Sequence, residues 1–306
     1  MWAEIAGEGK AGLSNDPLAK LVCRVREAPE EISYARMSLE VAREIWPDLD
    51  DGQIVKLETE LNQKGDELKK RLEGAQDGQK IVRKINKFIY SELALRAFRD
   101  FEPEKENPEL FFPHTVLKHK QGACLGLSLV YLSLCERAQI PVYAVHSPQH
   151  MYVRYDNGEE QLNIETTERG RIFKEKSLIT RQKLKTEELQ KMKNVYFRQV
   201  DKLEVLGDIL NVLCWCSAIQ TAEWPLSPER AVLAARLCVE IGEENFVNWD
   251  TLAQAYFYAK QYGLALEMFN RAHELRPSHI GSYGKQYWKD RLRLFTEATS
   301  KELVEK

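Results

Sequence analysis

The sequence predicts an α+β fold: a helix-rich core with a small antiparallel sheet, followed by an all-α region of helical repeats. Apolar residues recur at intervals of three or four over most of the chain, which is typical of amphipathic helices. Between about residues 142 and 165 the pattern changes to the alternation of strands. After residue 206 a similarity with a period of 34 residues begins, and this period indicates repeated helix pairs.

Composition and charge exclude several classes of protein. A chain of 306 residues with 43% hydrophobic and 30% charged residues can bury a sizeable core without disulfides. The net charge of -3, without a block of Lys or Arg, argues against a nucleic-acid partner. There is no apolar run of about 18 residues and no signal-like stretch at the start, so we expect no membrane association and a cytoplasmic location.

Cysteine spacing gives no sign of a metal or a cofactor. The six cysteines are Cys23, Cys124, Cys135, Cys214, Cys216 and Cys238. They form no CxxC pair and no Cys/His cluster with zinc-finger spacing, so we expect no bound metal. Cys135, Cys214 and Cys238 lie in apolar helical stretches, where a thiol is usually buried as a small hydrophobe. Cys124 alone has an unusual setting.

The first part of the chain predicts an arm and then helices. Residues 1–20, rich in Gly, Ala, Asn and Asp, are expected to form a flexible N-terminal arm. A first domain over residues 21–205 then begins with a helical subdomain. The first expected helix is capped by Ser38 and ends at Ile45. The second runs from Gln53 to Leu72, and the third follows Asp77.

The middle of this domain predicts a buried helix and a hairpin. From Cys124 to about Arg137 apolar residues surround most of the helix, as in a central, buried helix. Val142 to Val145 is expected to be a strand. Two more strands, His150–Tyr155 and Glu160–Glu165, flank Asn157-Gly158, the strongest short signal for a two-residue type I′ turn.

The register of this hairpin follows from the turn. If Asn157 and Gly158 are the two turn residues, His150 lies directly opposite Glu165, at a Cβ separation of about 4.5 to 5.5 Å. A carboxylate can then reach the imidazole. One face carries the apolar residues and the other the polar ones, and a slip of one residue would exchange the two faces. The residues of the polar face are His150, Tyr152, Arg154, Gln161, Asn163 and Glu165.

Three of these residues predict thiol chemistry. A carboxylate bonded to one ring nitrogen fixes the tautomer of a histidine and stabilises its cation, which is the role of the third member of a catalytic triad. Cys124 begins the buried helix, where backbone N–H groups and the helix dipole favour a thiolate. We therefore predict Cys124 as nucleophile, His150 as base and Glu165 as the group that orients the base. The helix amides and the Gln121 side chain are the expected oxyanion donors.

Alternatives exist for two of the three positions. His146 competes with His150 because it lies four residues away, although no carboxylate is equally well placed for it. Asn163 is the fallback orienting residue, and Glu165 would then be a structural partner of a base such as Arg154. Two further histidines are expected on the surface: His114 and His119.

Residues 206–306 form the predicted repeat region. Trp215 and Trp249 lie 34 positions apart, and the second copy resembles the tetratricopeptide family. The matching positions are Trp249, Leu252, Ala253, Tyr256, Ala265, Phe269, Ala272 and Pro277. The first copy is degenerate. A last helix around Tyr283 to Ala298 is expected to cap the stack.

The stretches around the three predicted catalytic residues resemble the transglutaminase-like superfamily. They read Gly122-Ala-Cys-Leu-Gly-Leu-Ser, His150-Met-Tyr-Val and Leu-Asn-Ile-Glu165-Thr-Thr. The resemblance is to a bacterial branch that also carries C-terminal tetratricopeptide repeats. It implies a papain/transglutaminase-like core with Cys124, His150 and Glu165 in the triad positions. The sequence departs from the family pattern in having Glu165 where Asp is usual and Tyr152 where Trp is often found.

Two hypotheses of function follow. The first is a cysteine hydrolase or acyltransferase that acts on an amide or peptide bond through a thioester. The alternative is an inactive transglutaminase-like scaffold that binds a protein partner with its helical repeats, since the resembling branch includes members that have lost the nucleophile. Both imply a protein or peptide as substrate or partner. The sequence specifies neither the substrate nor the oligomeric state.

Overall fold

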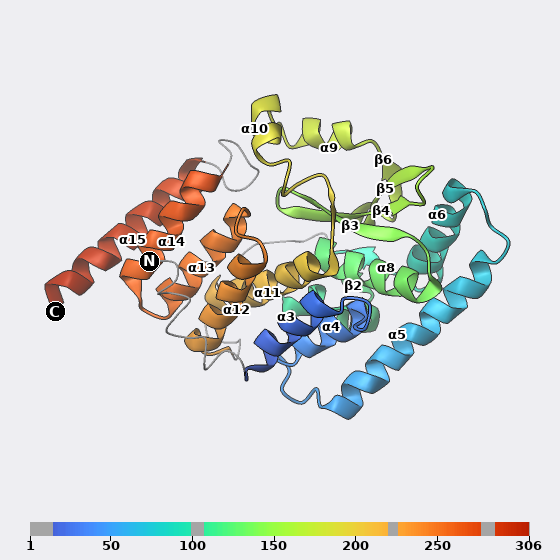
Figure 1. Ribbon diagram of the computed structural model, residues 1–306, viewed down its shortest axis with the longest axis horizontal. Coiled ribbons are helices and arrows are strands. Elements are labelled where there is room, and N and C mark those ends of the chain that lie inside the picture. The colour runs from blue at the N-terminus through green and yellow to red at the C-terminus, as the bar shows by residue number, and fades with distance from the viewer. Residues whose placement is uncertain (1–14, 99–106, 220–225, 277–284, 306) are drawn as a thin grey trace.

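The computed structural model describes residues 15–98, 107–219, 226–276 and 285–305, and it confirms a helix-rich α+β fold with a small antiparallel sheet (Figure 1). In this part of the chain the main sheet has five strands in the order β6-β5-β4-β3-β7. Its strands are β3 (Val142–Ser147), β4 (His150–Asp156), β5 (Gln161–Glu165), β6 (Arg171–Phe173) and β7 (Gln199–Val200). All neighbouring strands in it are antiparallel.

Helices precede the sheet in the chain. They are α3 (Pro17–Glu27), α4 (Tyr34–Ala42), α5 (Asp51–Leu72) and α6 (Gly78–Asn86), and a π-helical segment η1 (Lys87–Glu92) continues α6. The side chains of Asp50 and Asp77 accept hydrogen bonds from the first turns of α5 and α6, as residues at N-caps do. Both helices agree with the sequence prediction.

The predicted start of α4 was wrong. The N-cap is Ser33, whose hydroxyl accepts a hydrogen bond from the backbone N–H of Arg36. Ser38 is fully buried inside the helix and its hydroxyl donates to the Tyr34 carbonyl. A serine can bond either way, so its presence alone does not locate a helix end. Residues 1–14 of the predicted arm lie outside the described residues, and the chain is already helical from Pro17.

A short parallel pair of strands and a seven-residue helix lead to the central helix. The elements are β1 (Arg96–Ala97), η3 (Pro108–Leu110), α7 (Pro113–His119) and β2 (Gln121–Gly122), with β1 and β2 paired in parallel. His119 is exposed, as predicted. His114 is not a surface residue: it is half-buried with its ring edge-on to Trp46, at 5.2 Å between ring centroids.

The central helix α8 (Cys124–Ala138) is buried on nearly every side, as its sequence predicts. It packs against α5 and α7 and against strands β3 and β4 of the sheet. Gly126 permits the closest approach, because a Cβ at this position would overlap the carbonyl group of Leu110. The first turn of α8 is therefore held tightly against the segment before it.

The turn between β4 and β5 differs from the prediction. Asp156 lies opposite Gln161, so the loop comprises the four residues 157–160 instead of two. The Asn157 side chain accepts hydrogen bonds from the backbone N–H groups of Glu159 and Glu160, and Gly158 has a φ of 87°. These local bonds stabilise a wider loop than a type I′ turn. The register is displaced by two positions, which leaves every side chain on its predicted face.

Each face of the sheet is covered by a helix (Figure 1). One face packs on α8 through Met151, Val153, Tyr155, Leu162 and Ile164, which are all buried. On the other face Val145 and Tyr152 form a small cluster with Leu178 of α9 (Glu175–Arg181). The segments that follow β5 and α9 contain the 3-10 turn η4 (Thr166–Glu168) and helix α10 (Thr186–Lys191).

Five more helices follow in the described residues, and consecutive ones pack on each other along one end of the molecule (Figure 1). They are α11 (Lys202–Ile219), α12 (Pro228–Ile241), α13 (Phe246–Tyr258), α14 (Tyr262–Leu275) and α15 (Lys285–Glu305). The bounds of α12 and α14 differ by 34 residues at both ends. Their assignment to tetratricopeptide repeats stays a prediction, and the predicted domain boundary after residue 205 falls inside α11.

The last helix, α15, covers α14. Its buried Trp288 and Phe295 each lie 5.1 Å, between ring centroids, from Phe269 of α14. In the described part of the chain, no helix combines the length and the apolar character that a membrane-spanning segment needs.

Candidate active site

Cys124 is the first residue of α8 and is partly exposed. The preceding residue, Ala123, is the N-cap and supplies no side-chain cap to the helix amides. The sulfur accepts a hydrogen bond from the backbone N–H of Met151 in β4 and is hydrogen-bonded to the His150 side chain. Backbone N–H groups at a helix start stabilise negative charge, so this position suits a thiolate.

His150 begins β4 and lies between Cys124 and Glu165. Its Nε2 is 2.8 Å from Oε2 and 3.0 Å from Oε1 of the Glu165 carboxylate. Since Nε2 is used by the carboxylate, Nδ1 is the ring nitrogen left for the thiol. The Glu165 side chain is only 2% exposed and that of His150 is 19% exposed. A buried carboxylate thus fixes the orientation of the imidazole.

The Glu165 carboxylate is itself held by Thr167. The Thr167 hydroxyl donates to Oε1 at 2.6 Å, and the backbone N–H of Thr167 donates to the same oxygen at 3.2 Å. On the other side, the Nη2 of Arg181 lies 3.8 Å from Oε2. A buried carboxylate needs such partners to stay ionised.

The electrostatics favour an ion pair between thiolate and imidazolium. Burial alone would raise the pKa of the Cys124 thiol, but the hydrogen bond and positive charge of His150 outweigh it and lower that pKa. Burial likewise opposes the charged form of His150, yet its bonds to Cys124 and Glu165 raise the pKa of the imidazole to about 10. Against its own burial, the bond to His150 lowers the pKa of Glu165.

The contact between His150 and Glu165 does not use the predicted pairing. In the observed register the strand position opposite Glu165 is two residues beyond His150, so the two residues are diagonal neighbours on one face. Diagonal neighbours are about 7 to 8 Å apart, a distance that only long side chains can bridge. A glutamate is one methylene longer than an aspartate, which gives a physical reason for Glu165 at this position.

A family comparison covers the same region. Residues 56–211, about half of the chain, match the model of the transglutaminase-like superfamily, and all three residues of the hydrogen-bonded chain lie within the match. The chain belongs to the transglutaminase-like superfamily. This match extends from inside α5 to inside α11 and so includes α8 and the whole sheet.

Two further comparisons accompany this match. A search of curated proteins finds no match to the sequence. Among solved structures, the chain is similar to a crystal structure of menin that reveals the binding site for the Mixed Lineage Leukemia (MLL) protein. The two chains are 13% identical, the alignment covers 90% of this chain and 73% of that one, and the TM-score is 0.47.

The two remaining predicted site residues in this transglutaminase-like domain have other partners. The carboxamide oxygen of Gln121 accepts from Nε and Nη2 of Arg96 at 2.8 and 2.7 Å. Its amide nitrogen is thus its remaining donor. Asn163 accepts a hydrogen bond from Nε of Arg154 at 2.7 Å, and it is Glu165 that contacts His150. The structure therefore brings together Cys124, His150 and Glu165, and leaves Gln121 and Asn163 outside their hydrogen-bonded chain.

His146 has a carboxylate partner that the sequence did not reveal. Its Nε2 lies 2.5 Å from Oδ2 of Asp208, which α11 contributes. The expectation that no carboxylate is well placed for His146 was therefore wrong, because the partner is 62 residues away in a helix assigned to another domain. Burial opposes the imidazolium, but the charge and hydrogen bond of Asp208 raise the pKa of His146 above its ordinary value.

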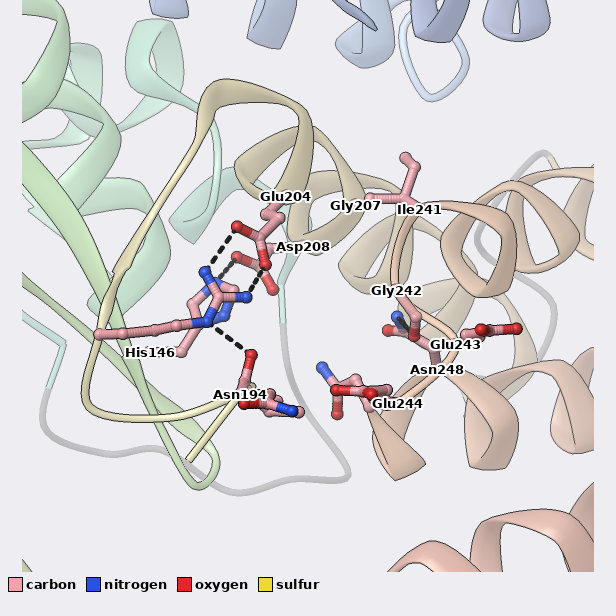
Figure 2. Close-up of a pocket in the computed structure, with 13 residues that line it drawn as sticks. His146, Asn194, Glu204, Gly207, Asp208, Ile241, Gly242, Glu243, Glu244 and Asn248 are labelled. Carbon is pink, nitrogen blue, oxygen red and sulfur yellow. Dashed lines mark hydrogen bonds and ion pairs between the residues drawn. The ribbon is translucent and has the colours of Figure 1, made fainter. Parts of the chain in front are cut away.

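Figure 2 shows this second pair at one side of a cavity of about 240 Å³ between the sheet and the turn from α12 to α13. Arg198 and Glu204 form a neighbouring ion pair, and Glu243 and Glu244 lie across the cavity. Within the described residues, no group of three or more His, Cys, Asp or Glu is arranged to hold a metal ion. The His146–Asp208 pair joins the hairpin that carries His150 to α11.

We predict that Glu165→Asp lowers the pKa of His150, because the shorter side chain no longer spans the diagonal. The loss of a hydrogen bond to a charged group costs about 1.5 to 3 kcal/mol, which corresponds to a fall of at least about one pH unit. The pKa is measured by titrating the ring resonances of His150 by NMR, with Glu165→Gln as the reference for complete loss of the charge. An unchanged pKa in Glu165→Asp would show that side-chain length does not determine the contact.

We also predict that the His146–Asp208 pair stabilises the fold in a pH-dependent way. Because the folded state raises the pKa of His146, the contribution is complete below the unfolded value of about 6.5 and is lost as pH rises through the folded value. A double-mutant cycle of His146→Gln and Asp208→Asn, followed by urea unfolding, should give a coupling of about 1 to 2 kcal/mol near pH 6. The coupling should shrink near pH 9. A coupling that grows with pH would contradict the assignment.

Proposed function

We propose that this protein is a cysteine-dependent amide hydrolase or acyltransferase that acts on a protein or peptide through a triad of Cys124, His150 and Glu165. One observation carries the proposal: a thiol at the start of a buried helix is hydrogen-bonded to an imidazole, and a buried carboxylate holds the opposite nitrogen of that ring. The pattern is that of an activated nucleophile with its base and the group that orients the base.

The proposed reaction starts from the ion pair. The Cys124 thiolate attacks the carbonyl carbon of an amide, and the carbonyl electrons move to the oxygen. As the tetrahedral intermediate collapses, the carbon–nitrogen bond breaks and His150 gives its proton to the departing amine. A thioester remains on Cys124. Water or a second amine then attacks it, with His150 as the base, and the thiolate is regenerated.

The start of α8 supplies the oxyanion donors in this proposal. The first amides of a helix have no intrahelical acceptor, and no side chain among the described residues caps this end of α8. Their N–H groups and the helix dipole favour an oxyanion beside Cys124. The amide nitrogen of Gln121, three residues before the nucleophile, is the proposed second donor.

The free energy needed to desolvate the charged groups of the site favours a catalytic role over the scaffold hypothesis. A buried carboxylate and a thiolate are expensive to desolvate, and a scaffold gains nothing from holding them next to an imidazole. Thiol-dependent turnover supports the enzyme. Binding of a partner by the helical repeats, unaffected by loss of the thiol, would support the scaffold.

Cys124 should be alkylated rapidly near pH 6 by an iodoacetamide probe, because a thiol of lowered pKa is ionised where ordinary thiols of pKa about 8.5 are not. Cys124→Ala should abolish this labelling. The matched control is Cys23→Ala, which removes an exposed cysteine from α3 and should leave the rapid labelling intact. Equal labelling of Cys124→Ala and wild type would refute the proposed nucleophile.

The pH dependence of the same reaction should depend on His150. In His150→Asn, burial of Cys124 is no longer opposed by a cation, so the thiol pKa should rise above about 8.5 and the rate near pH 6 should fall at least about tenfold. The rate of alkylation is measured between about pH 5 and 10. His146→Asn, which changes a nearby histidine bound to a different carboxylate, should keep the wild-type profile. A profile unchanged by His150→Asn would contradict the ion pair.

A further inference from the structure

A second cavity, of about 250 Å³, opens beside His150 and is separate from the one in Figure 2. It lies between the turn that joins β3 to β4 and the end of α9. The lining residues are Pro148, Gln149, His150, Leu178, Arg181, Gln182 and Leu184. Whole small-molecule sites usually exceed about 300 Å³. This pocket therefore suits one side chain or one end group of a larger substrate.

One wall of the pocket is apolar and fixed. Leu178 and Leu184 are 2% and 9% exposed and supply its hydrophobic surface. The Gln182 amide donates a hydrogen bond to the Pro148 carbonyl at 3.0 Å, which ties the end of α9 to the hairpin turn. An aliphatic segment gains free energy by burying apolar surface against this wall.

The charged groups of the pocket are both basic. His150 and Arg181 line it, and none of the lining residues from the described part of the chain carries a carboxylate. The Arg181 side chain is 55% exposed, and its Nη1 donates to Glu168 at 3.0 Å. The Nη2 of the same side chain lies 3.8 Å from Oε2 of Glu165. A guanidinium has five N–H donors in a planar fork, so these two contacts still leave donors for a ligand.

We propose that this pocket selects a substrate that carries a carboxylate on a short aliphatic stem, such as a glutamate side chain or the C-terminal end of a peptide. Arg181 binds the carboxylate, and Leu178 and Leu184 contact the stem. This inference rests on the proposed thiol chemistry, because the pocket adjoins the base of the triad. Arg181 is then the residue that determines specificity for an anionic group next to the reacting bond.

The test compares two reagents that differ in charge at the same thiol. Iodoacetate carries a carboxylate and iodoacetamide does not, so the ratio of their second-order rates near pH 6 reports attraction of an anion. Arg181→Gln should lower this ratio by about three- to tenfold, as expected for a charge within reach in a partly exposed site. Any change in the ionisation of Cys124 affects both reagents and cancels in the ratio.

Two control variants complete the comparison. Arg181→Lys keeps the charge and should keep most of the ratio. Arg171→Gln removes another exposed arginine that also pairs with Glu168 but does not line the pocket, so it should leave the ratio unchanged. High salt should reduce the difference between wild type and Arg181→Gln. The inference is overturned if the ratio is the same in wild type and Arg181→Gln.

A second measurement separates this inference from the proposed function. In the Cys124→Ala protein, titration with glutarate should shift the ring resonances of His150, and Arg181→Gln should weaken this binding by a similar factor. If wild type is not alkylated near pH 6, the proposed function fails and the glutarate titration alone decides the inference. If the binding of glutarate does not depend on Arg181 in that case, the inference about the pocket is overturned as well.

Discussion

The site depends on the burial of α8 against the sheet. This helix is apolar around its circumference and is enclosed by α5, α7 and strands β3 and β4. Interiors are packed densely, so a helix held on all sides cannot shift along its axis. The position of its first residue is therefore fixed, and Cys124 is placed within hydrogen-bond reach of Met151 and His150 in β4. Gly126 contributes by allowing the first turn to touch the backbone at Leu110. The burial of an apolar helix thus determines where the polar groups of Cys124, His150 and Glu165 meet.

The sequence predicted the faces of the β4–β5 hairpin but not its register. Alternation of apolar and polar residues has a period of two, so it identifies the face of each side chain and is unchanged by a displacement of two. Only the turn distinguishes the two registers. The Asn157-Gly158 pair favours a two-residue turn in general, yet here the Asn157 side chain bonds to two backbone N–H groups and stabilises a four-residue loop. The predicted contact between His150 and Glu165 is nevertheless observed, because both residues lie on the polar face in either register and the Glu165 side chain is long enough to span the diagonal.

The partners that the sequence did not reveal lie far away along the chain. Asp208 reaches His146 from a helix 62 residues later, and Arg96 reaches Gln121 from a strand 25 residues earlier. Helical periodicity predicts which side of α11 is apolar, but it does not tell which strand that helix will meet. The start of a helix was predicted best where the cap follows a clear loop, as at Asp77. Ser38 misled because a serine inside a helix can bond to the preceding turn instead of capping it.

The charges at the site alternate in sign from one group to the next. The order is the Cys124 sulfur, whose thiolate form is favoured, then the His150 imidazolium, the Glu165 carboxylate and the Arg181 guanidinium. Each ion is flanked by the opposite sign, which offsets the desolvation that would otherwise neutralise the buried members. The hydrogen bond and charge of His150, together with the two hydrogen bonds from Thr167, lower the pKa of Glu165 although its side chain is almost fully buried. In the proposed function, the charge of a bound substrate acts on this series of charges, because Arg181 at its outer end is exposed and lines the pocket.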